Sequence, residues 1–148
     1  MQLMLTTDYA VRCMLYLAKK NDCISSQEIS KQCAIDRDFA QKILRKLRNA
    51  GLISVQMGAT GGYSLSRPAR DITIHEVLEC MEDTMHINRC LEEDRFCTRG
   101  AADSCEMRAF YRQVQDRLDE ILFNTTLQDI IDGKTGKTVE HILTKRGA

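Results

Sequence analysis

The sequence has no apolar stretch of the roughly 18 residues that a membrane-spanning helix requires, so we expect no membrane span. Its N-terminal residues, MQLMLTTDYAVRC, lack the basic start, apolar core and small-residue cleavage site of a secretory signal. These absences lead us to expect a cytoplasmic protein. The cysteine count is seven, which is odd, so structural disulfides are not expected in a reducing compartment.

The chain also lacks a recognisable catalytic constellation. We find no paired carboxylates suited to acid–base chemistry, no Ser-His-Asp set and no GxxxxGK phosphate loop. We therefore expect neither an enzyme nor a protein with a small-molecule substrate. The 148 residues suffice for one domain, or for a small domain with an appendage.

Charge is balanced in total but not along the chain. Residues 1–70 contain 11 Lys and Arg against 5 Asp and Glu, a net charge of +6. Residues 71–148 contain 10 against 16, a net charge of −6. A basic half favours a polyanionic partner such as DNA, and the neutral total does not argue against it because the local field steers binding.

Hydrophobic spacing predicts three helices in the first part of the chain, over roughly 8–20, 25–32 and 36–50. The runs LISVQM and YSLSR on either side of GATGG predict a β-hairpin. Helix, short helix, turn, helix and hairpin is the order of a winged helix-turn-helix domain, which we assign to residues 1–70. We expect the first helix to pack at the dimer and cofactor side as well.

Helix caps and buried faces follow from the same pattern. Thr6 or Thr7 is expected to cap the first helix and Asp36 the third. The expected inner face of the third helix consists of Phe39, Ala40, Ile43, Leu44 and Leu47. Cys13 and Cys33 are expected to be small packing residues of the helices.

Two sets of residues are candidates for DNA contact. Arg and Lys can bind guanine edges or phosphates, and Gln can bind adenine. On the third helix the candidates are Arg37, Gln41, Lys42 and Arg45. In the hairpin, Gly58, Gly61 and Gly62 would let the backbone approach DNA without a Cβ clash. The alternatives are an ordinary solvated helix face and a plain tight turn.

The second part of the chain, residues 71–133, has a helix over about 73–83 and a long helix over about 104–123. An apolar seam along the long helix resembles a coiled-coil face, so we expect it to pack against another copy or across its own domain. Between the helices lies a polar loop, residues 86–104. Residues 134–148 are polar and punctuated by glycine, and we expect a mobile tail.

Three cysteines, Cys90, Cys97 and Cys105, fall in or next to this polar loop. Because their surroundings are charged, these thiols are not expected to fill a core. Thiolates are soft ligands for iron–sulfur clusters or zinc. The spacing Cys-x6-Cys-x7-Cys is looser than that of a zinc knuckle, and it leaves one coordination position for another residue.

The chain resembles the winged-helix regulators that include IscR, the iron–sulfur biogenesis regulator, and NsrR, the nitric oxide sensor. The resemblance covers nearly the whole chain, to about residue 132. It rests on TTDYAVRCMLYLA, on FAQKILRKLRNAGLISVQMGATGGYSLSR, and on the three-cysteine loop before a long helix. It implies a mainly α fold, a homodimer joined by the long helix, and a double-stranded DNA operator.

The resemblance further implies that Cys90, Cys97 and Cys105 bind an iron–sulfur cluster, with 4Fe–4S favoured over 2Fe–2S. IscR-like proteins supply a histidine where this chain has Arg108, a poor ligand. NsrR-like proteins use an aspartate of the partner subunit at the position of Asp8. Loss or nitrosylation of the cluster would then change which DNA is bound.

Three other readings compete with a cluster-controlled regulator. The same cysteines could serve a cluster-free thiol sensor or a zinc sensor. The chain could instead be a small electron-transfer protein or redox enzyme. It could also be an interaction module that binds a metabolic enzyme through the long helix. The signal sensed, the operator and the direction of regulation are left open.

Overall fold

The computed structural model describes residues 2–135, and the expected tail falls almost entirely outside them. The first five elements are α1 (Leu5–Lys20), α2 (Ser26–Cys33), α3 (Arg37–Asn49), β1 (Ile53–Gln56) and β2 (Gly62–Leu65). The next five are η1 (Ala69–Asp71), α4 (Ile74–Glu79), η2 (Arg89–Leu91), α5 (Glu106–Asn124) and α6 (Leu127–Ile131). This order confirms the mainly α winged helix-turn-helix with a long C-terminal helix.

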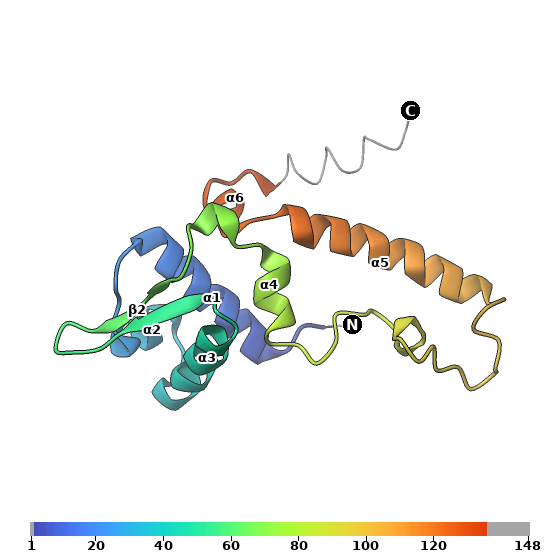
Figure 1. Cartoon of the computed structure of the whole chain (residues 1–148), viewed down its shortest axis with the longest axis horizontal. Helices are drawn as coiled ribbons and strands as arrows, with labels where there is room; N and C mark the ends of the chain where they lie inside the picture. The colour runs from blue at the N-terminus through green and yellow to red at the C-terminus, as the bar shows by residue number, and fades with distance from the viewer. Residues whose placement is uncertain (1, 136–148) are drawn as a thin grey trace.

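One hydrophobic core holds α1, α2, α3 and the hairpin together (Figure 1). Its fully buried side chains include Met14, Leu17, Ile29, Leu44 and Leu47. These residues recur at helical spacing, so each helix presents one apolar face inward and leaves its polar face in water.

The third helix, α3, begins and ends as its sequence predicts. The Asp36 carboxylate accepts hydrogen bonds from the backbone N–H groups of Asp38 and Phe39, which caps the helix. Gly51 follows the helix with φ of +73°, the left-handed conformation that glycine adopts readily. Phe39, expected on the inner face, is 47 % exposed instead, and the Lys42 ammonium lies 5.5 Å from its ring centroid.

The expected cap of α1 is wrong. The helix begins at Leu5, with Met4 as the N-cap residue and no capping side chain of its own. A carboxylate from beyond α4 takes that role, because Glu82 Oε1 accepts from the Met4 backbone N–H at 2.9 Å and from Thr7 Oγ1 at 2.5 Å. A negative charge at a helix N-terminus is also favoured by the helix dipole.

The hairpin packs its second strand against the segment before α2. Strands β1 and β2 are antiparallel, with Val55 opposite Tyr63. Tyr63 also exchanges backbone hydrogen bonds with Ile24, both of 2.8 Å. The base of the wing is therefore fixed to the helical core, while Met57 near its tip is exposed.

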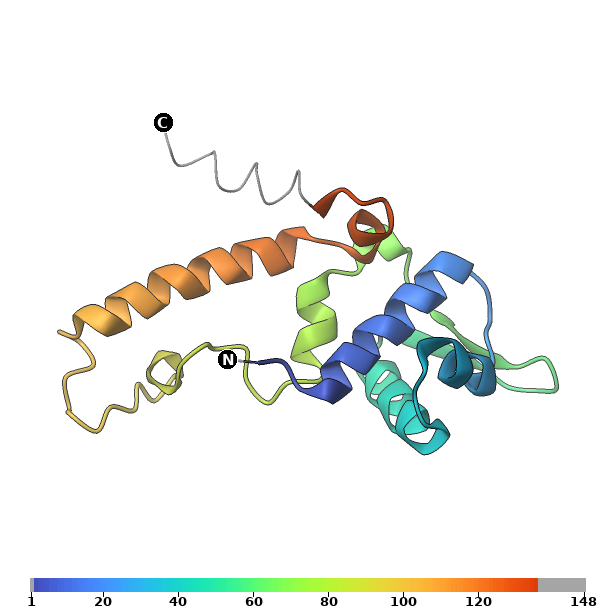
Figure 2. The ribbon, with the colours of Figure 1, turned by 180° about the vertical axis from the view of Figure 1, so that it is seen from behind.

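Helix α5 extends away from α1, α2, α3 and the hairpin along the longest axis of the molecule, and residues 81–105 run beside it (Figures 1 and 2). Its C-terminal end is fixed to the start of α4, since Ile74 N–H donates to Thr125 O and Leu127 N–H donates to Ile72 O. Within the described residues, no helix is both long and apolar enough to cross a membrane.

Candidate nucleic-acid interface and cysteine loop

The outer face of α3 carries the residues predicted to contact DNA. All of them are exposed, and Arg48 extends the same basic surface: Arg37, Gln41, Lys42, Arg45 and Arg48. Among the described residues, none of these cations forms an ion pair with a carboxylate, whereas the opposite face of α3 is buried. The side chains are therefore available to phosphates and base edges, which are the groups that Arg, Lys and Gln bind on DNA.

The three glycines of the hairpin, or wing, are required for different local reasons. Gly58 has φ of +117° and open space around it. Residues with a side chain rarely adopt this backbone conformation, so the turn favours glycine. A Cβ on Gly61 would lie 2.3 Å from Gln56 O, and one on Gly62 would lie 2.4 Å from Ile24 O. Gly61 and Gly62 are thus required by packing within the chain, whatever the wing contacts on DNA.

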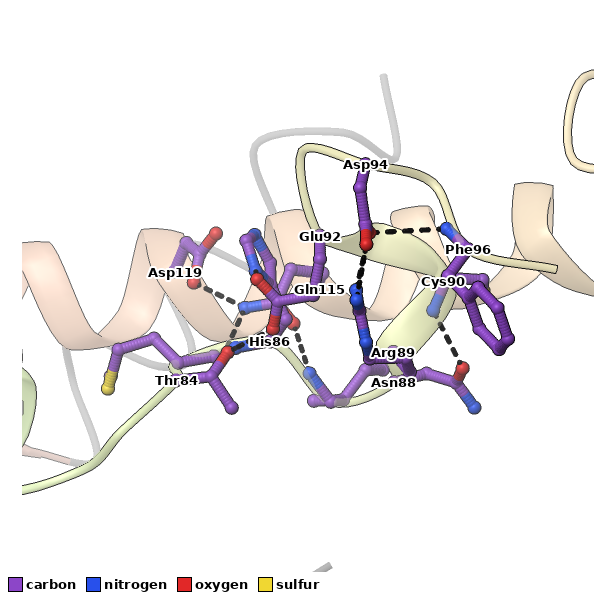
Figure 3. Close-up of polar contacts among 12 residues, drawn as sticks. Thr84, His86, Asn88, Arg89, Cys90, Glu92, Asp94, Phe96, Gln115 and Asp119 are labelled. Carbon is purple, nitrogen blue, oxygen red and sulfur yellow. Dashed lines mark hydrogen bonds and ion pairs between the residues drawn. The ribbon is translucent and has the colours of Figure 1, made fainter.

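The loop before α5 is held by a buried amide. Gln115, on α5, accepts from the Ile87 backbone N–H at 2.8 Å and donates to Met85 O at 3.1 Å (Figure 3). Its Nε2 also donates to Asp119 Oδ1 at 2.7 Å, which orients the amide. Among the described residues of α5, Gln115 and Arg108 are the buried polar side chains.

Arg108, which lies on the same helix, holds the next part of the loop. Its Nε donates to Cys90 O at 2.9 Å, so the guanidinium holds the loop backbone at the first cysteine. Together, Arg108 and Gln115 fasten the loop from Met85 to Cys90 onto α5. The sequence marks Arg108 as a poor metal ligand and a cation that could offset thiolate charge. It gives no sign of the role of Gln115, because a lone glutamine inside an amphipathic pattern carries no motif.

Other charges of the loop pair with one another. The Arg89 guanidinium binds the Asp94 carboxylate through two hydrogen bonds (Figure 3). Arg95 Nη1 lies 2.9 Å from Asp103 Oδ1, and His86 Nδ1 lies 3.2 Å from Glu92 Oε2. Hydrogen bonds from Thr84 and His86 lower the pKa of Glu92. These pairs order the loop, and they engage cations that could otherwise balance thiolate charge.

The three loop cysteines are free and partly exposed, each in a different backbone setting. Cys90 lies in η2, and its N–H donates to Asn88 Oδ1. Cys97 begins a turn, where the backbone N–H groups of Ala101 and Arg99 lower the pKa of its thiol. Cys105 is the N-cap residue of α5 and has extended backbone geometry.

Chemically this donor set fits a soft metal centre, since all three ligand atoms are thiols and the setting of Cys97 favours its ionised form. The structure does not gather them: among residues 2–135, no three His, Cys, Asp or Glu side chains lie close enough to hold a metal ion. Asp8 is exposed on the first turn of α1 and binds Arg12, with 2.5 Å between Oδ2 and Nη2.

Comparison with known proteins identifies the family to which the chain is similar. The family model described as Rrf2, iron-dependent transcriptional regulator, matches residues 3–133. The chain is 32% identical over 136 residues to protein aau3 of Rhizobium meliloti, covering 90% of this chain and 87% of that one. It is 30% identical over 128 residues to the transcriptional regulator IscR of Escherichia coli, covering 85% and 77%.

Solved structures agree on the fold. CymR, the global cysteine regulator of B. subtilis, aligns with a TM-score of 0.74 at 25% identity, over 88% of this chain and 95% of that one. IscR of T. potens aligns with a TM-score of 0.70 at 22% identity, over 90% and 88%. These relatives are transcriptional regulators rather than enzymes, as the sequence predicted. The chain belongs to the Rrf2 family of transcriptional regulators.

Proposed function

We propose that this regulator binds operator DNA as a homodimer and that an iron–sulfur cluster bound by Cys90, Cys97 and Cys105 controls that binding. The observation that carries the proposal is three free, partly exposed thiols within sixteen residues of one polar loop docked on α5. Similarity to IscR of Escherichia coli supports it.

DNA contact is assigned to α3 and the wing. The basic side chains on the outer face of α3 are free of carboxylate partners within the described residues, and Gly58 lies at the tip of the hairpin. We propose that Arg37, Gln41, Lys42 and Arg45 enter the major groove. The backbone at Gly58, Gly61 and Gly62 approaches the flanking phosphates.

A double substitution tests this assignment. Lys42→Ala with Arg45→Ala should weaken operator binding on the order of 100-fold at fixed salt and make it less salt-dependent, because each lost contact is worth about 1–3 kcal/mol. Arg112→Ala, an exposed cation on α5, is the matched control. Equal gel-shift affinities for the double variant, the control and the unmodified protein would remove α3 from the interface.

The homodimer is assigned to α5. Met107 and Phe110 are 52 % and 54 % exposed, although both belong to the apolar seam that the sequence predicts. Val114 and Leu118 continue the seam and are half-buried. A second copy packing along this seam would bury these side chains, and it would allow Asp8 of one subunit to reach the cysteine loop of the other.

Communication between loop and DNA runs through contacts on this chain. Arg108 and Gln115 couple the loop to α5, and the end of α5 is bonded to the start of α4. Three residues before Met85, the first loop residue bound by Gln115, Glu82 caps α1, the central helix of the DNA-binding core. When bound, an iron–sulfur cluster would supply a centre sensitive to oxidants, nitric oxide and iron supply.

The fourth ligand and the cluster type are also part of the proposal. Arg108 is a poor metal ligand and donates to Cys90 O, so it is not offered as the fourth ligand. We propose Asp8 of the partner subunit, which requires its ion pair with Arg12 to open. A 4Fe–4S cluster is favoured over 2Fe–2S.

A cluster-free thiol regulator is the second candidate, or a zinc-binding one on the same cysteines. One observation favours it: the similar B. subtilis protein is a cysteine regulator. Metal analysis of protein purified without oxygen separates the two, since zinc, iron with sulfide, and no metal are three different results.

The decisive variant is Cys97→Ser. It should abolish the visible absorption of anaerobically purified protein and change its promoter affinity, whereas Cys23→Ser, outside the loop, should alter neither. Retention of both the absorption and the original affinity by Cys97→Ser would remove Cys97 from the ligand set.

A further inference from the structure

Two cysteines outside the loop meet inside the DNA-binding core. Cys13 lies on α1 and Cys33 is the last residue of α2, a helix that packs against α1. Both thiols are free and buried, with exposures of 0 % and 6 %. Both belong to the same cluster of buried core residues, and a hydrogen bond joins their side chains. The core therefore contains a reduced dithiol.

One member of this pair can be reached from solvent. Cys33 lines an open pocket on the surface between α1 and α2. The pocket is also lined by Arg12, Leu15, Tyr16, Lys19, Gln32 and Ala34. Arg12 lies at the opening and its charge favours the Cys33 thiolate, whereas the fully buried Cys13 does not line the pocket.

The two thiols differ in their readiness to ionise. A hydrogen bond from Cys13 lowers the pKa of Cys33, and the charge of Arg12 acts in the same direction against the effect of burial. The pKa of Cys13 is raised by its hydrogen bond with Cys33, by burial, and by the charge of the Cys33 thiolate. Because Cys33 lines the pocket and Cys13 is fully buried, Cys33 is assigned as the nucleophile and Cys13 as the thiol that closes the disulfide.

We propose that Cys13 and Cys33 form a peroxide-reactive dithiol that closes to a disulfide and weakens DNA binding, independently of the loop cysteines. In the first step the Cys33 thiolate attacks a peroxide oxygen; a sulfur–oxygen bond forms, the oxygen–oxygen bond breaks, and the alcohol or water leaves after taking up a proton. Cys33 becomes a sulfenic acid.

In the second step the Cys13 sulfur attacks the Cys33 sulfur. The sulfur–sulfur bond forms, the sulfur–oxygen bond breaks, and water leaves with the proton of Cys13. Two thiols lose two electrons and two protons in total, and the peroxide is reduced. Oxidation of Cys33 also removes the thiolate charge that opposes ionisation of Cys13, so the first step prepares the second.

The disulfide would act on DNA binding through the turn between α2 and α3. Ala34, next to Cys33, has φ of +54°, and Asp36 then caps α3. Ser30 and Ile35 hold this turn with two hydrogen bonds, of 3.0 and 2.7 Å. Bonded sulfurs lie only about 2.05 Å apart, so closure draws the end of α2 toward α1 and displaces α3.

The test uses the full chain, purified without oxygen and without bound metal, and treated with one equivalent of hydrogen peroxide. Digestion and mass spectrometry should recover a cross-linked peptide pair containing Cys13 and Cys33, reversed by a thiol reductant. Affinity for a duplex selected from a random-sequence library by the reduced protein should fall about tenfold on oxidation and return on reduction.

Variants separate this inference from the cluster proposal. The triple variant Cys90→Ser, Cys97→Ser, Cys105→Ser should retain both the cross-link and the loss of affinity, and so should Cys23→Ser. Cys13→Ser should accumulate a Cys33 sulfenic acid that a 1,3-diketone traps. Absence of the Cys13–Cys33 peptide from oxidised unmodified protein, or unchanged DNA affinity when the cross-link is present, would overturn the inference.

Discussion

Replacing Gln115 by alanine should free the cysteine loop from α5 while leaving the rest of the fold in place. The amide makes two bonds to the loop backbone, at Ile87 N–H and Met85 O. Each is worth about 0.5–1.5 kcal/mol net, so the loop loses about 1–3 kcal/mol of docking free energy. That change raises the population of the opened loop by about 5- to 150-fold.

Hydrogen exchange measured by mass spectrometry reports this opening directly. In Gln115→Ala, the peptide spanning residues 84–91 should exchange about 5- to 150-fold faster, while peptides from α3 keep their protection. Gln113→Ala is the matched control, because Gln113 is exposed on the same helix. Identical exchange of residues 84–91 in the two variants and the unmodified protein would refute the role assigned to Gln115.

Three further predictions concern other contacts. Gly62→Ala should cost about 1–3 kcal/mol of unfolding free energy in urea melts, because its Cβ would overlap Ile24 O; an unchanged midpoint would contradict this. Glu82→Ala should lower the same free energy by about 1–2 kcal/mol by leaving buried Thr7 without its acceptor, whereas equal stability would show that water replaces the carboxylate. Cys97 should be alkylated with a midpoint below the usual thiol pKa, because backbone N–H groups stabilise its thiolate; a midpoint at or above that value would contradict it.

The DNA-binding half is largely predictable because its signals are local. The start of α3 at Asp36, its buried face and the stop at Gly51 follow from capping and periodicity within one segment. Phe39 is the exception. It lies at the edge of the apolar face, where only the neighbouring elements decide whether a side chain is covered, and they leave it exposed beside Lys42.

Contacts between distant segments were not predictable. The carboxylate that caps α1 comes from Glu82, about 75 residues away, so the nearby Thr6 and Thr7 gave the wrong expectation. Likewise, α5 binds the loop through Gln115, and nothing in the local pattern marks that glutamine as buried.

The candidate site was predicted in composition but not in arrangement. Sequence spacing identifies Cys90, Cys97 and Cys105, yet thiols without a bound metal have no attraction that would gather them. The sequence did not predict the pairing of Cys13 with Cys33 for a different reason. Twenty residues separate them, and only the packing of α1 on α2 brings them together.

Iron and acid-labile sulfide in the anaerobically purified full chain test the central proposal most directly. The proposal predicts iron and sulfide in nearly equal amounts, close to four of each per chain for the favoured cluster type. It also predicts loss of both in the Cys90→Ser, Cys97→Ser, Cys105→Ser variant. Protein that contains neither iron nor sulfide, even after reconstitution, would contradict the account.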